Sequence, residues 1–180
     1  GAARSSPSQI GALTTWAHCA AGASTTHAIK TDGTLWAGGN NGSGRLGTNN
    51  LTFYSSPVQI GALTTWSKIY SGNSFSAALK TDGTLWTWGV NGSGQLGDGT
   101  QTSRSSPVQV GALTDWSDIS VGDAMMSGKA SSGQRWVWGG NAQGQLGLGN
   151  TTSYSSPVQL GSADDWTSLQ TIRFAMTLIT

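Results

Sequence analysis

Short stretches of alternating hydrophobic and polar residues, separated by glycine-containing turns, make up most of the chain. Residues 74–80 place Phe75, Ala77 and Leu79 on one side of an extended strand. The pair Asp82-Gly83 follows, and Asp-Gly is typical of a tight hairpin because it adopts positive φ angles. Residues 85–88, Leu-Trp-Thr-Trp, then form another strand with both indoles on one side. The pattern predicts β-hairpins.

Two more strands are predicted in the same stretch of sequence. One covers residues 58–60, directly after Pro57, since a proline is tolerated at the beginning of a strand. The other runs from Trp66 to residue 70. The strands do not alternate cleanly between apolar and polar residues, which is expected when both faces of a sheet are covered.

This four-strand unit recurs every 50 residues without insertion or deletion. The same step separates the prolines and a set of tryptophans: Pro7, Pro57, Pro107 and Pro157, and Trp16, Trp66, Trp116 and Trp166. A period near 50 with four strands per unit is typical of β-propeller blades. We therefore expect an all-β fold in which residues 1–180 form a single propeller segment of four-stranded antiparallel blades, with repeats at 5–54, 55–104 and 105–154 and a partial repeat at 155–180. Tryptophans should fill the space between blades, and glycines should lie where strands crowd toward the axis.

The stretch from Asp82 to Gly97, Asp-Gly-Thr-Leu-Trp-Thr-Trp-Gly-x-Asn-x-x-Gly-Gln-Leu-Gly, resembles the repeat of the regulator of chromosome condensation family. The resemblance covers nearly the whole chain and implies a seven-bladed propeller. Seven such repeats need about twice the length of this chain. The family's namesake is a nuclear exchange factor for a small GTPase, and other members inhibit β-lactamases or occur in bacterial and phage surface proteins. The resemblance thus implies a binding function and leaves the partner open.

The repeats depart from one another at a few positions. Gly38 replaces the second tryptophan of its strand, and Asn49 stands where other repeats have Gly99 and Gly149. In the last repeat Ile172 replaces a glycine. Residues 171–180 alternate through Phe174, Met176 and Leu178 and are predicted to form a strand with an open edge. We expect an open or partial ring that the remaining blades, or self-association of two arcs, would close.

Charge and composition exclude several partners. Nine basic and eight acidic residues leave a net charge of +1, without a basic stripe or tail, so nucleic-acid binding is not expected. No apolar run approaches the ~20 residues of a membrane-spanning helix, and the first residues lack the layout of a signal peptide. The polar but weakly charged composition favours an extracellular, cell-surface or virion setting.

Few residues have the chemistry of a catalytic or metal site. His18 aligns with Lys68 and Asp118 at an outward position, whereas His27 aligns with small residues on the packed face of its strand. Cys19 aligns with isoleucines and is expected to be a buried core residue. We therefore predict no catalytic residues, no enzyme activity and no cofactor, and structural roles for both histidines.

Metal and phosphate sites are weakly indicated. Asp115, Asp118 and Asp123 cluster in the third repeat, but their spacing matches no calcium-binding loop. Residues 92–94 lack the lysine of a nucleotide-binding loop, so their glycines are interpreted as turn residues. No metal ligand is predicted.

Loops that vary between repeats are the candidates for protein binding. They are residues 48–54, 98–104 and 148–154, and the hairpin tips at residues 23–26, 73–75 and 123–126. Phe53, Tyr54, Arg104 and Tyr154 in these loops are of the types that dominate interface energies. Drift in solvated loops explains the variation equally well. The sequence predicts a non-enzymatic protein-binding or structural module, with a GTPase exchange factor or an inhibitor of a secreted enzyme as alternatives.

Overall fold

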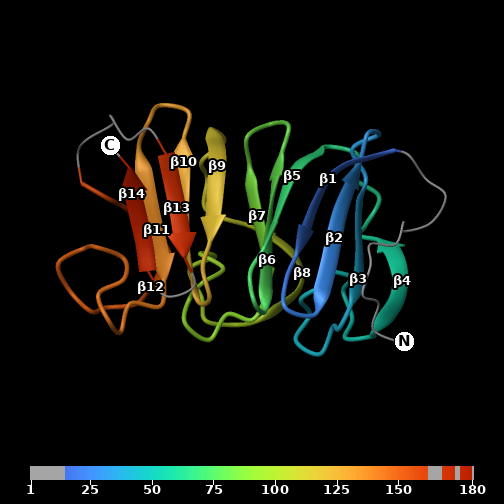
Figure 1. Cartoon of the computed structure of the whole chain (residues 1–180), viewed down its shortest axis with the longest axis horizontal. Coiled ribbons are helices and arrows are strands. Elements are labelled where there is room, and N and C mark those ends of the chain that lie inside the picture. The colour runs from blue at the N-terminus through green and yellow to red at the C-terminus, as the bar shows by residue number, and fades with distance from the viewer. Residues whose placement is uncertain (1–14, 162–167, 173–174, 180) are drawn as a thin grey trace.

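The computed structural model describes residues 15–161, 168–172 and 175–179, and all regular structure within these ranges is β-strand (Figure 1). The strands are β1 (Trp16–Ala21), β2 (Thr25–Lys30), β3 (Leu35–Gly39), β4 (Tyr54–Gln59), β5 (Trp66–Ser71), β6 (Phe75–Lys80), β7 (Leu85–Gly89), β8 (Arg104–Gln109), β9 (Trp116–Val121), β10 (Met125–Ala130), β11 (Arg135–Gly139), β12 (Tyr154–Gln159), β13 (Ser168–Ile172) and β14 (Ala175–Ile179).

These strands form three four-stranded antiparallel sheets and one hairpin. The sheet orders are β1-β2-β3-β4, β5-β6-β7-β8 and β9-β10-β11-β12, and β13 pairs with β14. We call the three sheets blade 1, blade 2 and blade 3. The expected all-β fold of four-stranded antiparallel blades is therefore confirmed.

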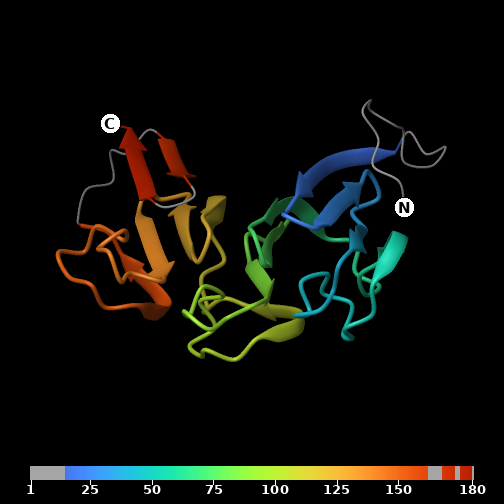
Figure 2. The same ribbon diagram turned by 60° about the horizontal axis from the view of Figure 1, so that its bottom comes forward.

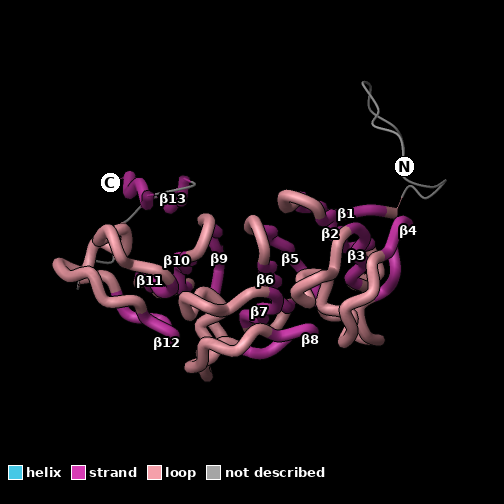
Figure 3. Tube along the Cα trace, turned by 90° about the horizontal axis from the view of Figure 1, so that it is seen from below, coloured by secondary structure: helices cyan, strands magenta, loops and turns pink. Residues whose placement is uncertain are grey.

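The blades stand side by side in an open arc, with blade 1 at one end and the β13–β14 hairpin at the other (Figure 2). Strands β5 and β9 lie toward the concave side of the arc, and β8 and β12 lie on its convex side (Figure 3). Each blade therefore runs outward from its first strand to its fourth, which is the arrangement in a propeller.

Each blade takes its outer strand from the beginning of the next sequence repeat. Strand β4, which contains the Ser-Ser-Pro sequence, pairs with the preceding tryptophan strand, with Tyr54 opposite Gly39 and Val58 opposite Ala37. It begins at Tyr54 and not at residue 58 as predicted, so Pro57 lies inside the strand. A register shift between Ala37 and Gly39 and the outer position of β4 accommodate a residue that has no N–H to donate.

The predicted hairpin turns are present, but only their glycines adopt positive φ. The φ angles are 77° at Gly33, 76° at Gly83 and 95° at Gly133. Asp32, which precedes the first of them, instead accepts hydrogen bonds on its carboxylate from the hydroxyl and the backbone N–H of Thr34, at 2.6 and 3.0 Å. These bonds hold the pKa of Asp32 below its usual value.

The hydrophobic core lies between blades, where indoles fill the space as expected. One cluster joins residues of blades 1 and 2, and another joins blades 2 and 3. Trp88 and Trp138 are fully buried in them. Near the axis, a Cβ on Gly22 would lie 2.6 Å from the carbonyl oxygen of Gly72 in the next blade, so only glycine fits there.

The C-terminal hairpin agrees in part with the strand predicted at 171–180. Strand β14 covers Ala175–Ile179, whereas residues 171 and 172 end the preceding strand β13. Phe174 lies outside the described residues. In the described part of the chain β14 pairs with β13 alone, so its second edge is unpaired there, as expected.

Candidate functional site

The contact between one blade and the next, which we call the seam, repeats twice with the same geometry. In the first seam the indole of Trp88 donates a hydrogen bond to the carbonyl of Arg45, at 3.0 Å. In the second, Trp138 donates to the carbonyl of Gln95 at the same distance. The loop after the third strand of one blade thus packs on the last tryptophan of the following blade.

Glycines allow this loop to approach the ring. A Cβ on Gly47 would lie 2.9 Å from the Trp88 ring, and one on Gly97 would lie 2.6 Å from the Trp138 ring. Both glycines have φ angles above 70°, so any side chain there would be strained as well as crowded.

The same loop also reaches the outer strand of the next blade. Asn49 donates its backbone N–H to the carbonyl of Ser105 at 2.7 Å, and Gly99 donates to Ser155 at 2.8 Å. Asn49 has a φ of 58°, which explains why glycine stands at this position in the other repeats.

A buried asparagine gives the loop its shape. Asn91 accepts a hydrogen bond from the N–H of Leu96 at 2.9 Å and donates to the carbonyl of Thr100 at 3.0 Å. Asn41 and Asn141 make the equivalent bonds to Leu46 and Leu146. The loops are therefore held in one conformation before anything docks on them.

In blades 2 and 3, the loop of the preceding blade packs on the face that carries the last tryptophan. None of the described residues covers the corresponding face of blade 1. Cys19 lies on this face, at the position of Ile69 and Ile119, which are 1% and 3% exposed. The prediction that Cys19 is a buried core residue is wrong, because the free thiol is exposed. A position that is buried between blades elsewhere faces outward at the end of the arc.

This open face is hollowed into a groove of about 650 Å³. Its walls include Trp16, Cys19, Ala28, Trp36, Gly38, Phe53, Tyr54 and Pro57. The groove is mostly apolar, and Phe53 is 64% exposed at its edge. An arrangement of this kind is suited to receive apolar side chains.

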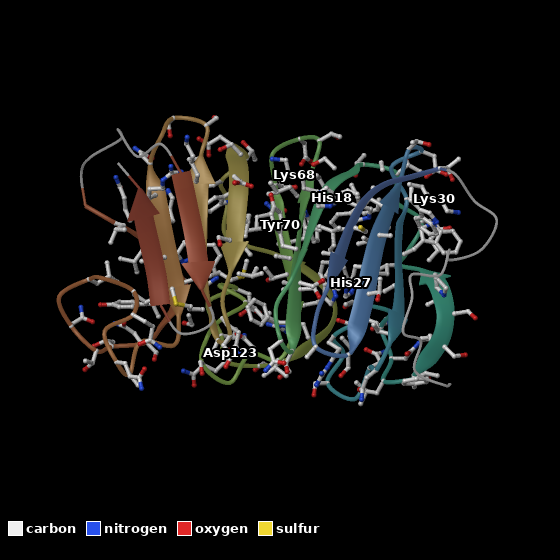
Figure 4. All side chains as sticks on the ribbon, in the orientation of Figure 1. His18, His27, Lys30, Lys68, Tyr70 and Asp123 are labelled. Carbon is white, nitrogen blue, oxygen red and sulfur yellow. The ribbon has the colours of Figure 1, made fainter. Side chains whose placement is uncertain are left out.

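A cation lies against the aromatic walls. The ammonium of Lys30 sits 3.8 Å from the centre of the Trp36 ring and 5.4 Å from that of Trp16 (Figure 4). Lys80 lies in the same way on Trp66 and Trp86 in blade 2. Cation–π contacts of this type hold the ring pair in place in both blades.

The four predicted docking residues do not form one site. The structure brings Phe53 and Tyr54 together in the groove of blade 1. Arg104 begins β8 and forms an ion pair with Asp98 at 2.7 Å, and the Asp98 side chain is only 2% exposed. Burial alone would raise the pKa of Asp98, but hydrogen bonds from Thr100 and Arg104 hold it below its usual value.

Tyr154 also has structural contacts. It packs against the hydrophobic clusters of blade 3, and its hydroxyl accepts a hydrogen bond from Asn150 at 3.2 Å. Tyr54 accepts the equivalent bond from Asn50 at 3.0 Å. Arg104 and Tyr154 therefore have polar contacts within their own loops.

A row of polar side chains follows the first strands of the blades (Figure 4). Tyr70 donates its hydroxyl proton to Asp118 at 2.7 Å, and Lys68 lies 3.8 Å from the same carboxylate. Burial, together with this bond to Asp118, raises the pKa of Tyr70. His18 is exposed, as expected, and accepts a long hydrogen bond of 3.4 Å from the N–H of Ile69. These contacts join neighbouring blades.

His27 is fully buried in the first seam, as its alignment with small residues indicated. Its ring packs against Trp88 with centres 5.7 Å apart, and Nδ1 lies 3.1 Å from the hydroxyl of Ser71. Burial lowers the pKa of His27 to about 4, and the nearby carbonyls of Arg45 and Leu46 oppose the shift only in part. Because this pKa lies well below 7, the ring is neutral at physiological pH.

No metal centre is found among the described residues, where no group of three His, Cys, Asp or Glu side chains could hold an ion. Asp118 is bound to Tyr70 and Lys68, and Asp123 accepts a hydrogen bond from Asn73 at 3.0 Å. No helix that could cross a membrane occurs in the part of the chain that the structure describes.

Sequence reasoning missed the groove residues other than Phe53 and Tyr54. The signal was present in the exchange of tryptophan for Gly38, and in Leu51 and Phe53, which replace Gln101 and Ser103 of the next repeat. Leu51 is 63% exposed beside Phe53. Two of these departures, Gly38 and Phe53, line the groove of blade 1.

Comparison with known families agrees with this architecture. The profile described as "Regulator of chromosome condensation (RCC1) repeat" matches residues 32–79, 82–125 and 132–170. A second profile with the same description matches residues 66–95. No match was found among curated proteins.

Several solved structures have the same fold. Prp20p from Saccharomyces cerevisiae is 16% identical with a TM-score of 0.80, covering 92% of this chain and 43% of that one. Human WBSCR16 is 20% identical with a TM-score of 0.79, covering 91% and 44%. The structure of Kap60 bound to yeast RCC1 (Prp20) gives 18% identity and a TM-score of 0.70, covering 88% and 40%. The chain therefore spans less than half the length of each of these three proteins.

Proposed function

Because the chain belongs to the regulator of chromosome condensation (RCC1) repeat family, we propose that it is a protein-binding propeller module without catalytic activity of its own. Rigid blades hold variable loops and one open blade face toward a protein partner. The observation that carries this proposal is the apolar groove of blade 1 with Phe53 exposed at its edge. Exposed apolar surface of this kind is a feature of interaction sites.

The solved relatives support a binding function. Prp20p is described as binding Gsp1p and histones, and yeast RCC1 as bound to Kap60. In this chain the buried asparagines and the seams fix the blades, so a partner meets a preformed surface. Preformed surfaces bind with little loss of conformational entropy.

The two ends of the arc are the places where further protein would associate. Blade 1 has an uncovered seam face, and β14 has an unpaired edge in the described part of the chain. The remaining blades of a longer chain, or a second copy, would close the ring at these ends. Sedimentation analysis of the purified chain separates a monomer from a pair of arcs.

The binding proposal is tested with a variant that the chain itself suggests. Leu51→Gln together with Phe53→Ser gives blade 1 the residues that blade 2 carries at these positions. Both side chains are exposed, so the variant should keep the stability of the wild type. A partner identified by cross-linking to the wild type should bind the variant at least tenfold more weakly in a purified two-component titration. Equal binding of both proteins would contradict a docking role for this surface.

The narrower alternatives remain predictions. A role as exchange factor predicts faster nucleotide release from a small GTPase when the chain is added, and a role as inhibitor predicts tight one-to-one binding to a secreted enzyme. A setting at the cell surface or on a virion is favoured by composition alone. Absence of nucleic-acid binding is tested by titration with duplex DNA at low salt, where electrostatic binding is strongest.

A further inference from the structure

Two of the three asparagines that shape the seam loops are followed by glycine, which is the pair most prone to deamidation. The sequences are Asn41-Gly42 and Asn91-Gly92, whereas the third repeat has Asn141-Ala142. In deamidation the backbone nitrogen of the following residue attacks the side-chain carbonyl carbon of the asparagine. Glycine has no Cβ and leaves that nitrogen unhindered, and asparagine is for this reason among the thermolabile residues. The three loops therefore differ in chemical stability although their asparagines make equivalent hydrogen bonds.

The reaction at Asn91 needs no reagent other than water. The Gly92 nitrogen forms a bond to Cγ of Asn91 while the bond from Cγ to Nδ2 breaks, and ammonia leaves with the proton that the Gly92 nitrogen gave up. The product is a cyclic succinimide, which a water molecule opens at either carbonyl to give aspartate or isoaspartate. A neutral amide thereby becomes a carboxylate, and isoaspartate also lengthens the main chain by a methylene group.

The folded loop holds the Asn91 amide where this reaction cannot proceed. Asn91 is fully buried, and its Oδ1 accepts a hydrogen bond from the N–H of Leu96 at 2.9 Å. Nδ2 donates to the carbonyls of Thr100 and Thr102 at 3.0 and 3.1 Å, and to the carboxylate of Asp98 at 3.1 Å. Attack requires the amide to turn back toward its own backbone. These bonds to residues 96–102 must therefore break before the reaction can begin.

We propose that Asn91-Gly92 is a deamidation site that the folded loop closes and unfolding opens, with Asn41-Gly42 as a second and less damaging site. Prolonged unfolding then converts the chain into a form that cannot rebuild the second seam. Chemical modification of the unfolded state is a general route to irreversible unfolding. No partner is needed for this change, which limits how long an unfolded chain can still refold.

A carboxylate in place of the Asn91 amide would meet acceptors at the positions to which Nδ2 now donates. It would also place a negative charge beside Asp98, whose side chain is only 2% exposed. Two like charges so close together in a buried site cannot both ionise without a large cost, and the carbonyls that lose their donor are left unsatisfied. The same loop carries the carbonyl of Gln95 to which Trp138 donates. Damage at Asn91 therefore loosens the second seam.

Asn41 has the same role in the first loop but milder surroundings. Its Nδ2 donates to the hydroxyl of Thr48 at 3.0 Å and to the carbonyl of Asn50 at 2.8 Å. Thr48 stands where the second loop has Asp98, and a hydroxyl can rotate to donate to a carboxylate. Deamidation at Asn41 should therefore destabilise the chain less than deamidation at Asn91.

This ranking is measured with variants that carry the product from the start. Asn91→Asp should lower the denaturant midpoint of unfolding more than Asn41→Asp, or abolish folding. Asn91→Asp with the midpoint of the wild type would overturn the proposal, and equal losses in the two variants would overturn the part assigned to Asp98.

The reaction itself is followed on the purified chain in mildly alkaline buffer, with and without guanidinium chloride. Peptide mapping by mass spectrometry gives the deamidated fraction at each asparagine after increasing times. In denaturant Asn41 and Asn91 should react at least tenfold faster than Asn141. In native buffer both should react at least tenfold more slowly than in denaturant. Equal rates at Asn91 in the two buffers, or equal rates at Asn91 and Asn141 in denaturant, would overturn the proposal.

Return of the incubated samples to native buffer measures the loss of refolding. The fraction that regains native tryptophan fluorescence should fall as fast as Asn91 is converted. The matched control is Gly92→Ala with Gly42→Ala, which copies Ala142 of the third repeat. Neither glycine has a positive φ. A Cβ on Gly92 would meet no atom within 4 Å, and one on Gly42 would meet only the side chain of Asn40, at 3.3 Å.

This double variant should fold like the wild type and should still refold after the same incubation. If it does not fold, Gly92→Ala alone serves in its place, with the same expectation for the second seam. A loss of refolding in the variant as fast as in the wild type would overturn the proposal, because the damage would then lie elsewhere in the chain.

Discussion

Blades 1 and 2 come from the same kind of sequence repeat and have the same strands, yet their corresponding faces have different surroundings. The face of blade 2 is covered by blade 1, so Trp66, Ile69 and Ala78 are all less than 5% exposed. The matching face of blade 1 carries an exposed Cys19 and half-buried Trp16 and Ala28. The comparison shows that burial in this fold is assigned by the neighbouring blade and not by the strand itself.

The largest expected difference is between Trp66→Ala and Trp16→Ala, which remove the same residue from the covered and the open face. Trp66→Ala should lower the free energy of unfolding by about 3–5 kcal/mol, the usual loss for a buried aromatic residue. Trp16→Ala should cost about 1 kcal/mol, because part of its surface already meets solvent. Urea unfolding followed by circular dichroism measures both. Equal losses would mean that blade 1 is covered in solution.

The second prediction concerns pH, because the first seam contains His27 where the second contains Ser127. Burial holds the pKa of His27 at about 4, below the 6.5 of an unfolded chain. The unfolded state therefore takes up the proton first. The stability that His27 contributes is complete above pH 6.5 and falls by up to roughly 3 kcal/mol as the pH drops to 4.

This acid loss is checked by urea unfolding at several pH values between 4 and 7. The variant His27→Ser, which copies the third repeat, should remove most of the slope. His18→Ser is the matched control for the removal of a histidine, since that ring is exposed. A slope that His27→Ser leaves in place would contradict the assignment.

A smaller effect separates two glycines with the same backbone conformation. Gly97 and Gly149 have φ angles of 71° and 72°, so alanine costs the same backbone strain at both. Only at Gly97 would the new Cβ meet a ring, at 2.6 Å from Trp138. Gly97→Ala should therefore be less stable than Gly149→Ala by about 1–3 kcal/mol. Similar melting temperatures for the two variants would show that the Trp138 ring can move to accommodate the added methyl group.

The smallest effect divides the predicted docking residues. Arg104→Ala leaves the buried Asp98 without its ion-pair partner and should lower the free energy of unfolding by about 1–2 kcal/mol. Phe53→Ala removes an exposed ring and should change it by less than about 0.5 kcal/mol. The reverse order in thermal unfolding would show that the ion pair between Arg104 and Asp98 does not stabilise the chain.

The fold could be predicted because the same sequence pattern recurs every 50 residues along the chain. The fixed step between tryptophans and the glycine turns indicated blades, and turn glycines such as Gly83 have the positive φ that was expected. The ends of the strands were harder to predict. A strand was expected to begin directly after Pro57, but Pro57 lies within β4. The pairing of β4 with the previous tryptophan strand is a long-range choice that local propensity does not contain.

The surroundings of the candidate residues were less predictable, for a related reason. The docking role of Phe53 and Tyr54 stays a prediction, and Cys19 was assigned to the core because two of its equivalents are isoleucines. Its exposure depends on which blade stands at the end of the arc, and no local pattern records that. The exchange of tryptophan for Gly38 was visible in the sequence. That this exchange leaves a hollow in the surface of blade 1 became clear only from the structure, in which Gly38 lines the groove.

The offset between blades and sequence repeats has a consequence for how such a chain can grow or shrink. A unit of 50 residues begins with the outer strand of one blade and ends with the inner strands of the next. Duplicating or deleting one unit therefore leaves every sheet with four strands, wherever the cut falls. Genes of this kind can change their number of blades by unequal recombination without ever encoding an unfinished sheet inside the array.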